Sequence, residues 1–311
     1  MWISTHLSLD NIIYPRYYFG MSKANKYSIQ NLRKDFPTDE ACLEFLFKGL
    51  HSEQCSCGGT YKKVAKRLQY QCSKCRFQIA PMAGTIFEKS STPLTLWFHA
   101  LFIFSNAKSG ISAKEMERQL GVTYKTAWRI LKLIREALQQ SSDKLSGDVE
   151  MDEGYFGGKH YAGKNNKNLG EAMRKKSIVI AAIERNGNAK VEVAPDVKAT
   201  TLGEFLDKNV AVQNTRLMTD GNNNYKNIAK GYDRHMVNHK RRQFASGDIH
   251  VNHVETFWAH VKRSTKGTHK VISKKYLQSY LDAFVFHYNN RGNDRERFEV
   301  LLGTLLLGAK S

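Results

Sequence analysis

Four of the five cysteines in this 311-residue chain fall between residues 55 and 75, and this cluster constrains the fold more than any other feature. They form two short pairs, Cys55-x-Cys57 and Cys72-x-x-Cys75. In a reducing compartment, clustered cysteines more often hold a metal than bridge each other. Two such pairs can supply four thiolates to one tetrahedral zinc ion, and the ion closes a ribbon too small to fold on apolar burial alone. We therefore predict a structural Zn²⁺ held by Cys55, Cys57, Cys72 and Cys75.

Two details of this segment leave alternatives open. The C-x-C pair is tighter than the usual zinc knuckle, and His51 could replace one of its ligands. A metal-free set of buried or redox-active cysteines is the competing interpretation. The fifth cysteine, Cys42, lies in an apolar-periodic stretch over residues 41–50, so we interpret it as a packed helix residue and not as a ligand.

The composition predicts a folded protein with a polyanionic partner. The formal net charge is +19 and the pI is about 9.6, while hydrophobic residues make up 41% of the chain. No apolar run approaches the roughly 18 to 20 residues that cross a bilayer, and no secretory signal pattern is present, so we expect a cytoplasmic protein without a membrane partner. Residues 1–20 are aromatic-rich and patternless. We interpret them as a tail, either non-native with Met21 as the start, or genuine and loosely ordered.

Residues 91–146 predict three helices separated by glycine-containing turns. A helix, a short turn and a second helix form the layout of helix-turn-helix DNA readers. Tyr124, Lys125 and Arg129 lie near the start and on the polar side of the last helix, so we predict that they contact DNA. The alternative is a small helical bundle whose charges are only solvated. The predicted helices span Pro93–Asn106, Ala113–Leu120 and Tyr124–Gln139, with Ser112 and Thr123 as N-caps of the last two.

From Gly147 onward the pattern changes to short β-rich runs followed by a helix, which is typical of an α/β domain. Asp152 ends one of these runs, and Asp220 closes another at a Gly-Asn turn. Carboxylates at strand ends face a shared edge of the sheet and not its core. The predicted strands are Val149–Met151, Ser177–Ile183, Lys190–Ala194 and Arg216–Thr219, with a helix over Thr201–Asn209.

A third carboxylate lies in the predicted helix over residues 250–265. Glu255 and Lys262 are seven residues apart in this segment, so they lie on nearly one face of the helix. Magnesium prefers oxygen ligands, and two such ions about 3.5–4 Å apart can clamp the attacking and leaving oxygens of a phosphodiester. Asp152, Asp220 and Glu255 together are a candidate site for this chemistry. Each carboxylate alone is equally typical of a turn cap or a surface charge.

Basic residues flank the Glu255 helix in the sequence. Lys240, Arg241 and Arg242 precede it, and Arg263 follows Lys262 directly. Lysine and arginine contacts to phosphates release counterions and give affinity without reading the base sequence. This distribution favours a nucleic acid as the substrate.

Taken together, these motifs resemble those of bacterial insertion-sequence transposases of the DDE type that carry an N-terminal zinc ribbon. The resemblance covers roughly residues 25–300, and its only departure is the C-x-C pair, where the family usually has C-x-x-C. The matching strings are Cys72-x-x-Cys75, Ala83-Gly84-Thr85-Ile86-Phe87, Pro93-Leu94-Thr95-Leu96-Trp97-Phe98, Asp152-Glu153-x-Tyr155-Phe156-Gly157-Gly158-Lys159, Thr219-Asp220-Gly221, His250-Val251-Asn252-x-x-Glu255-x-Phe257-Trp258-x-x-x-Lys262-Arg263 and Tyr288-Asn289-x-Arg291.

The resemblance implies an α/β fold with an RNase H-like catalytic domain, preceded by a small zinc ribbon and a helix-turn-helix segment. Asp152 would lie on the first strand, Asp220 just after the fourth, and Glu255 on a following helix. Family members vary at the third position, where Asn or His can replace Glu; we prefer Glu255 and keep Asn252 as a neighbouring polar contact. The expected divisions are a tail over 1–20, a helix and ribbon over 21–90, a helix-turn-helix region over 91–146 and a catalytic domain over 147–311.

The implied activity is DNA transposition. Two Mg²⁺ or Mn²⁺ ions on Asp152, Asp220 and Glu255 would activate water to cut at the transposon end, and the resulting 3′-hydroxyl would attack target DNA, with Lys262 holding the DNA backbone. The ribbon and helix-turn-helix would recognise the terminal inverted repeats. A homodimer or larger synaptic complex and a nucleoid-associated location are also implied. The competing functions are a non-catalytic DNA-binding regulator and an RNase H-like nuclease that does not join strands.

Overall fold

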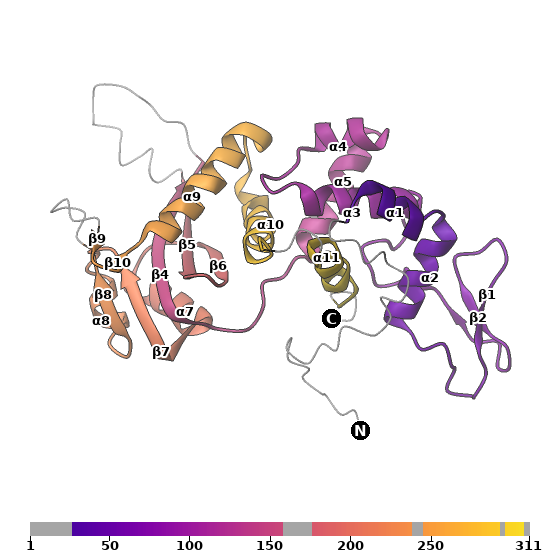
Figure 1. Ribbon diagram of the computed structural model, residues 1–311, viewed down its shortest axis with the longest axis horizontal. Helices are drawn as coiled ribbons and strands as arrows, with labels where there is room; N and C mark the ends of the chain where they lie inside the picture. The colour runs from indigo at the N-terminus through magenta and orange to yellow at the C-terminus, as the bar shows by residue number, and fades with distance from the viewer. Residues whose placement is uncertain (1–26, 158–175, 238–244, 293–295, 308–311) are drawn as a thin grey trace. The chain divides into compact units, whose positions relative to one another are not determined.

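The computed structural model describes residues 27–157, 176–237, 245–292 and 296–307, and within these ranges the chain forms two units (Figure 1). The first unit consists of residues 27–107 and 113–139 together with helix α11. The second consists of residues 108–112 and 140–291 within the described ranges. No helix in the described part of the chain combines the length and apolar character needed to span a bilayer. Residues 1–20 and the basic run 240–242 lie outside the described residues.

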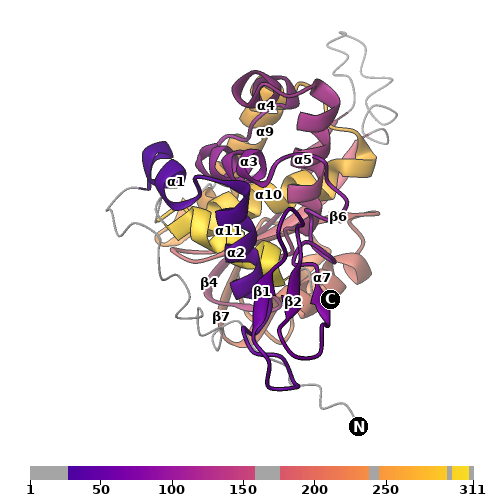
Figure 2. The ribbon, with the colours of Figure 1, turned by 90° about the vertical axis from the view of Figure 1, so that its right-hand side faces the viewer.

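The cysteine segment folds as a three-stranded antiparallel ribbon that packs on a helix. Figure 2 shows β1 and β2 beside α2 (Asp39–Leu50), where Phe47 of the helix stacks on Tyr70 of β2 at 3.9 Å between ring centroids. Cys42 is buried in α2, which confirms that it packs in a helix, and burial raises the pKa of its thiol to about 12. The strands, in the order β1-β2-β3, are Tyr61–Lys63, Tyr70–Cys72 and Gln78–Ile79.

The first unit is otherwise helical and is built around α3 (Leu94–Asn106). This helix is apolar on most of its surface, and Trp97 and Phe98 are fully buried. The helices predicted over residues 91–139 are present, and Thr123 caps α5 by accepting a hydrogen bond from the Thr126 backbone N–H. The other helices of this unit are α1 (Ile29–Asp35), α4 (Ala113–Leu120), α5 (Tyr124–Ala137) and α11 (Glu296–Leu307).

Helix α11 packs with the N-terminal helices, although the sequence places it at the end of the predicted catalytic domain. The ring of Phe298 stacks on that of Tyr27, with 5.3 Å between the centroids, and it forms a T-shaped contact with Phe102 at a centroid distance of 5.9 Å. The buried Arg297 donates a hydrogen bond to the Ser105 carbonyl. An apolar face on a terminal helix predicts burial but does not identify its partner, and for that reason the sequence could not assign α11 to a unit.

The second unit contains a five-stranded mixed sheet in the order β6-β5-β4-β7-β8 (Figure 1). Strands β4, β5 and β6 pair antiparallel, whereas β4 with β7 and β7 with β8 pair parallel. This order is that of the RNase H-like fold, and the predicted α/β fold class is confirmed. The strands are β4 (Leu145–Phe156), β5 (Ser177–Glu184), β6 (Ala189–Ala194), β7 (Val210–Thr219) and β8 (Asp233–Met236).

Helices cover both faces of this sheet. Helix α7 (Ala199–Asn209) packs on one face, and α9 (Asn252–Ser264) and α10 (Leu277–Asn289) pack on the other. The remaining short elements are α8 (Tyr225–Ile228), the hairpin β9 (Ala245–Ser246) with β10 (Ile249–His250), a π-helical turn over Thr265–His269 and a 3₁₀ turn over Lys274–Tyr276.

Successive side chains of β4 point to opposite faces of the sheet, and the two faces carry different kinds of residue. Val149 and Met151 are buried in the apolar cluster under α7, so Glu150, Asp152 and Gly154 lie on the face that α9 covers. The strand is much longer than the predicted Val149–Met151, because its pairing with β5 continues to Phe156 through polar and glycine residues.

Candidate functional site

Two of the three predicted carboxylates meet at one edge of the sheet. The parallel pairing of β4 with β7 ends at Met151 and Thr219, so the next residues, Asp152 within β4 and Asp220 just after β7, lie at the same end of this pairing. Carboxylate oxygens of Asp152, Glu153 and Asp220 all lie within 4.8 Å of one another. The topology thus brings together acids that are 68 positions apart in the chain.

Asp152 is held in place by α9. The indole Nε1 of Trp258 donates a hydrogen bond to Asp152 Oδ2 at 3.1 Å. Burial, together with the charges of Asp220 and Glu255, raises the pKa of Asp152 to about 6 against the hydrogen bonds that lower it. A carboxylate that is costly to ionise beside other carboxylates is stabilised by a cation.

Asp220 occupies a turn that is fixed from two sides. Its Oδ1 accepts a hydrogen bond from the Asn222 backbone N–H at 2.9 Å. Its carbonyl oxygen accepts one from Arg234 at 3.2 Å, and the same guanidinium donates through Nε to Thr219 Oγ1 at 3.0 Å. Arg234 therefore anchors the end of β7 without forming a carboxylate ion pair with Asp220.

The structure adds Glu153, which the sequence analysis did not single out. Its Oε1 accepts a hydrogen bond from the hydroxyl of the fully buried Tyr225 at 2.7 Å. Burial raises the pKa of Glu153 to about 7, and the charges of Asp152 and Asp220 contribute to the rise. The one sequence signal for this residue is its place next to Asp152 in an acidic pair.

Glu255 lies beside this group and outside the 4.8 Å set. It is in the first turn of α9, one turn before Trp258 and therefore on nearly the same face of the helix. Its charge contributes to the raised pKa of Asp152. Lys262 lies two turns farther along α9 and is exposed, and Asn252, at the start of α9, is exposed as well.

The donor set at this edge suits a hard divalent cation. Asp152, Glu153 and Asp220 offer only carboxylate oxygens, which are the ligands that Mg²⁺ and Mn²⁺ prefer. Burial and the neighbouring carboxylates raise the pKa values of Asp152 and Glu153, so ionising them in this place is costly. A bound cation would offset both the burial and the mutual repulsion.

The four clustered cysteines converge in the ribbon. All four sulfur atoms lie within 4.8 Å of one another; Cys55 and Cys75 are 3.6 Å apart, and Cys57 and Cys72 are 3.4 Å apart. Sulfurs about 2.3 Å from a tetrahedral zinc would be roughly 3.8 Å apart, so the arrangement fits such an ion. In the described part of the chain, this group of candidate ligands contains no histidine, so His51 is not a member.

The surroundings favour the thiolate at Cys55, whereas hydrogen bonds with the neighbouring cysteine side chains raise the pKa of Cys75 to about 12. The backbone N–H of Cys57 and the Tyr61 hydroxyl lower the pKa of Cys55 to about 6. Gly59 leaves room for Cys72, because a Cβ at Gly59 would lie 2.5 Å from the Cys72 sulfur. The C-x-C pair therefore reaches the same centre as the C-x-x-C pair despite its shorter spacing.

The predicted DNA-contacting residues of the first unit lie together on α5. Tyr124, Lys125 and Arg129 line one surface pocket of about 570 Å³ with Trp128 and Lys132. The sequence analysis missed these last two, although both lie one helical turn from predicted members. Of the basic residues predicted near Glu255, Arg263 is exposed on α9 next to Lys262.

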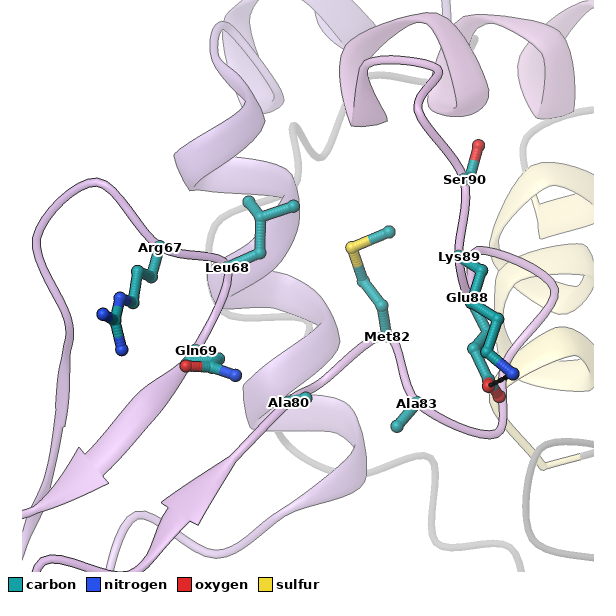
Figure 3. Close-up of a pocket in the computed structure, with 9 residues that line it drawn as sticks. All are labelled: Arg67, Leu68, Gln69, Ala80, Met82, Ala83, Glu88, Lys89 and Ser90. Carbon is teal, nitrogen blue, oxygen red and sulfur yellow. Dashed lines mark ion pairs between the residues drawn. The ribbon is translucent and has the colours of Figure 1, made fainter.

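A second pocket of about 540 Å³ lies between the ribbon and residues 80–90 (Figure 3). The side chains of Leu68 and Met82 form apolar walls, and Glu88 pairs with Lys89 at 3.2 Å along one side. None of its lining residues belongs to the acidic group or to the four cysteines.

Comparison with known proteins finds a family match within the second unit. Residues 144–289 match the ISXO2-like transposase domain. The match includes Asp152, Asp220, Glu255 and Lys262, and the resemblance to insertion-sequence transposases is confirmed. The chain is also 26% identical over 239 residues to an uncharacterized protein in transposable element ISH50 of Halobacterium salinarum, covering 73% of this chain and 79% of that protein.

The chain also matches two crystal structures of Mos1 complexes, both at low identity. The Mos1 strand transfer complex matches with a TM-score of 0.31 and 12% identity, over 69% of this chain and 78% of the Mos1 chain. The pre-cleavage Mos1 transpososome matches with a TM-score of 0.29 and 11% identity, over 68% and 76%.

Proposed function

We propose that this transposase binds the terminal inverted repeats of an insertion sequence, cleaves DNA at the ends and joins the 3′-hydroxyl to target DNA. The observation that carries the proposal is the convergence of Asp152 and Asp220 at one sheet edge, within a transposase domain and beside the helix that holds Glu255. The domain supports a DNA transposase in general, and the acidic edge supports the specific chemistry.

Asp152 and Asp220 would hold two Mg²⁺ or Mn²⁺ ions, and Glu255 would complete the site. Such ions, when bound, activate the attacking oxygen and stabilise the leaving oxygen of an in-line phosphoryl transfer. Asp152 is positioned for this role by the Trp258 indole, and Asp220 by its turn with Asn222. Glu153, held by the Tyr225 hydroxyl, adds negative charge at the same edge.

DNA would be held by basic residues in both units. Lys262 and Arg263 on α9 follow the acidic edge along the helix and suit the phosphate backbone of the reacting DNA. Tyr124, Lys125 and Arg129 on α5 would contact the transposon end. Lys240, Arg241 and Arg242 are proposed phosphate contacts from the sequence alone.

The ribbon would hold one structural Zn²⁺ on its four cysteines and would take part in end recognition. Joining two ends requires at least two active sites, so we include a homodimer or larger synaptic complex in the proposal. We also keep the predicted divisions at residues 21–90, 91–146 and 147–311 as proposed functional regions. Their boundaries are tested by the binding and joining of truncated chains.

A strand-transfer assay tests the proposal. The substrate is a pre-cut, labelled duplex with the sequence of a proposed transposon end, with plasmid as target and Mg²⁺ or Mn²⁺ present. We expect joined product from the natural protein, and its loss in Asp152→Ala, Asp220→Ala and Glu255→Ala with end binding within about twofold.

Each alternative outcome identifies a different function. Cleavage without joining would indicate a nuclease, and binding alone would indicate a regulator. Joining that survives one of the three substitutions would remove that residue from the proposed site. Leu206→Ala, in α7 on the opposite face of the sheet, is a matched control for general loss of stability.

A further inference from the structure

A second charged cluster lies directly behind the acidic edge. Glu150 of β4, Arg185 after β5, His250 of β10 and His253 of α9 meet within hydrogen-bonding distance. Glu150 is completely buried, with 0% of its surface exposed, and it precedes Asp152 by two residues on the same face of β4. A buried carboxylate in this position requires a full set of partners.

Both oxygens of Glu150 are satisfied, and most of the partners belong to the first turn of α9. Oε2 accepts hydrogen bonds from the backbone N–H groups of His253 at 2.7 Å and Val254 at 3.2 Å. Oε1 accepts one from Arg185 Nε at 2.8 Å and lies 2.8 Å from His253 Nδ1. Arg185 also donates to the His250 carbonyl at 3.0 Å.

These contacts replace a missing helix cap. The N-cap residue of α9 is Val251, whose side chain makes no capping hydrogen bond. The first backbone N–H groups of a helix need an acceptor, and a negative charge there is favoured by the helix dipole. Glu150 supplies that acceptor from another strand, so the cap of α9 is built into the strand that carries Asp152.

One carboxylate and two imidazoles also suggest a transition-metal site, but the contacts argue against it. The Arg185 guanidinium lies in direct contact with Glu150 Oε1, and it would repel a cation there. Oε2 is already used by two backbone N–H groups. The cluster is therefore a structural network that joins β4, the end of β5 and α9.

Strand β4 contacts α9 at a second position, one turn farther along the helix. Asp152 accepts the Trp258 hydrogen bond, and Gly154 allows the same indole to approach, because a Cβ at Gly154 would lie 3.1 Å from it. In the sequence, Glu255 lies between the first turn of α9, which donates hydrogen bonds to Glu150, and Trp258, which donates one to Asp152. Its place relative to Asp152 is consequently set by both contacts.

We infer that Glu150 and Arg185 are positioning residues that hold the first turn of α9 so that Glu255 is aligned with the acidic edge. The inference rests on the proposed function, since it assigns Glu255 to the metal site. It predicts that changing Glu150 weakens metal binding although Glu150 touches no metal. Substitutions of such supporting residues typically reduce metal affinity about 10- to 100-fold.

A double-mutant cycle on the full chain tests this inference without any catalytic readout. Mn²⁺ binding is measured by electron paramagnetic resonance for the natural protein, Glu150→Gln, Glu255→Gln and the double variant, with Asp152→Asn to identify signal from other sites. We expect Glu150→Gln to reduce Mn²⁺ affinity about tenfold or more. In the Glu255→Gln background it should have almost no further effect, because Glu150 acts through Glu255.

Two further variants separate positioning from general destabilisation. Leu206→Ala, buried on the opposite face of the sheet, should lower the unfolding midpoint and leave Mn²⁺ affinity unchanged. Arg185→Lys keeps the positive charge but loses the forked geometry of the guanidinium. Its Mn²⁺ affinity should therefore lie between that of the natural protein and that of Arg185→Ala. Hydrogen exchange should accelerate in the first turn of α9 in Glu150→Gln.

The outcomes distinguish this inference from the proposed function. Unchanged Mn²⁺ affinity in Glu150→Gln, additive effects in the cycle, or no Mn²⁺ binding by the natural protein would overturn the positioning role. Mn²⁺ binding with the expected coupling, but without strand joining on any end substrate, would support the positioning role and contradict the proposed function.

Discussion

Replacing Asp152 by Asn should stabilise the protein at pH 7.5 when no Mg²⁺ or Mn²⁺ is present, and should have little effect near pH 4. Burial, with the charges of Asp220 and Glu255, raises the pKa of Asp152 to about 6, so the ionised form is disfavoured in the folded state. Asn removes the charge and keeps an oxygen that can accept the Trp258 hydrogen bond.

The magnitude follows from the pKa. The ordinary aspartate pKa is near 4, and a tenfold change in an acid constant corresponds to about 1.4 kcal/mol, so ionised Asp152 costs at most about 3 kcal/mol of folding free energy. The cost is absent below about pH 4, where both states are protonated, and grows until about pH 6. It is constant above that pH. The gain in the variant should follow the same profile.

Urea unfolding of the full chain measures this gain at pH 4, 6 and 7.5. Adding Mn²⁺ should then stabilise the natural protein by mass action and the variant much less, because the ion binds only the intact acidic group. A variant that is no more stable than the natural protein at pH 7.5, or that gains equally at all three pH values, would refute the argument from burial and repulsion.

Three further predictions concern other parts of the chain. Cys72→Ser should release the zinc, measured colorimetrically as about one ion per natural chain and none per variant; full retention would exclude Cys72 as a ligand. Lys125→Ala with Arg129→Ala should weaken end binding and reduce the slope of log affinity against log salt by up to about 0.9 per phosphate contact; an unchanged slope would exclude phosphate contact. Gly154→Ala should cost about 1–3 kcal/mol in denaturant unfolding and lower Mn²⁺ affinity, because the new methyl would meet the rings of Phe156 and Trp258; an unperturbed variant would show that β4 and α9 tolerate separation.

Local sequence signals predicted much of the secondary structure. The cap residue Thr123 and the Gly121 turn determine where α5 begins, and these are encoded within a few residues. The closeness of Asp152 and Asp220 was also predicted from the local pattern of β-rich runs, although Asp152 follows the end of the parallel pairing with β7 and not the end of β4. The four cysteines converged for a similar reason, since two short pairs on a hairpin have few other arrangements.

Features that depend on distant contacts were not predictable in the same way. Alternation in β4 shows that Glu150 and Asp152 share a face, but it does not show that α9 covers that face. The partners of Glu150 are Arg185 and His253, which are 35 and 103 positions away. Strand β8 is polar and exposed or half-buried, so its sequence has no hydrophobic pattern that predicts a strand. It forms a strand because it pairs with β7.

The most direct test of the metal site is a crystal structure of the protein with Mn²⁺ and a transposon-end duplex, using anomalous scattering to locate the ions. We expect Mn²⁺ about 2 Å from carboxylate oxygens of both Asp152 and Asp220, with Glu255 directed at the same group. Ions bound elsewhere, or Asp152 and Asp220 oxygens too far apart to share an ion in the DNA complex, would contradict the account.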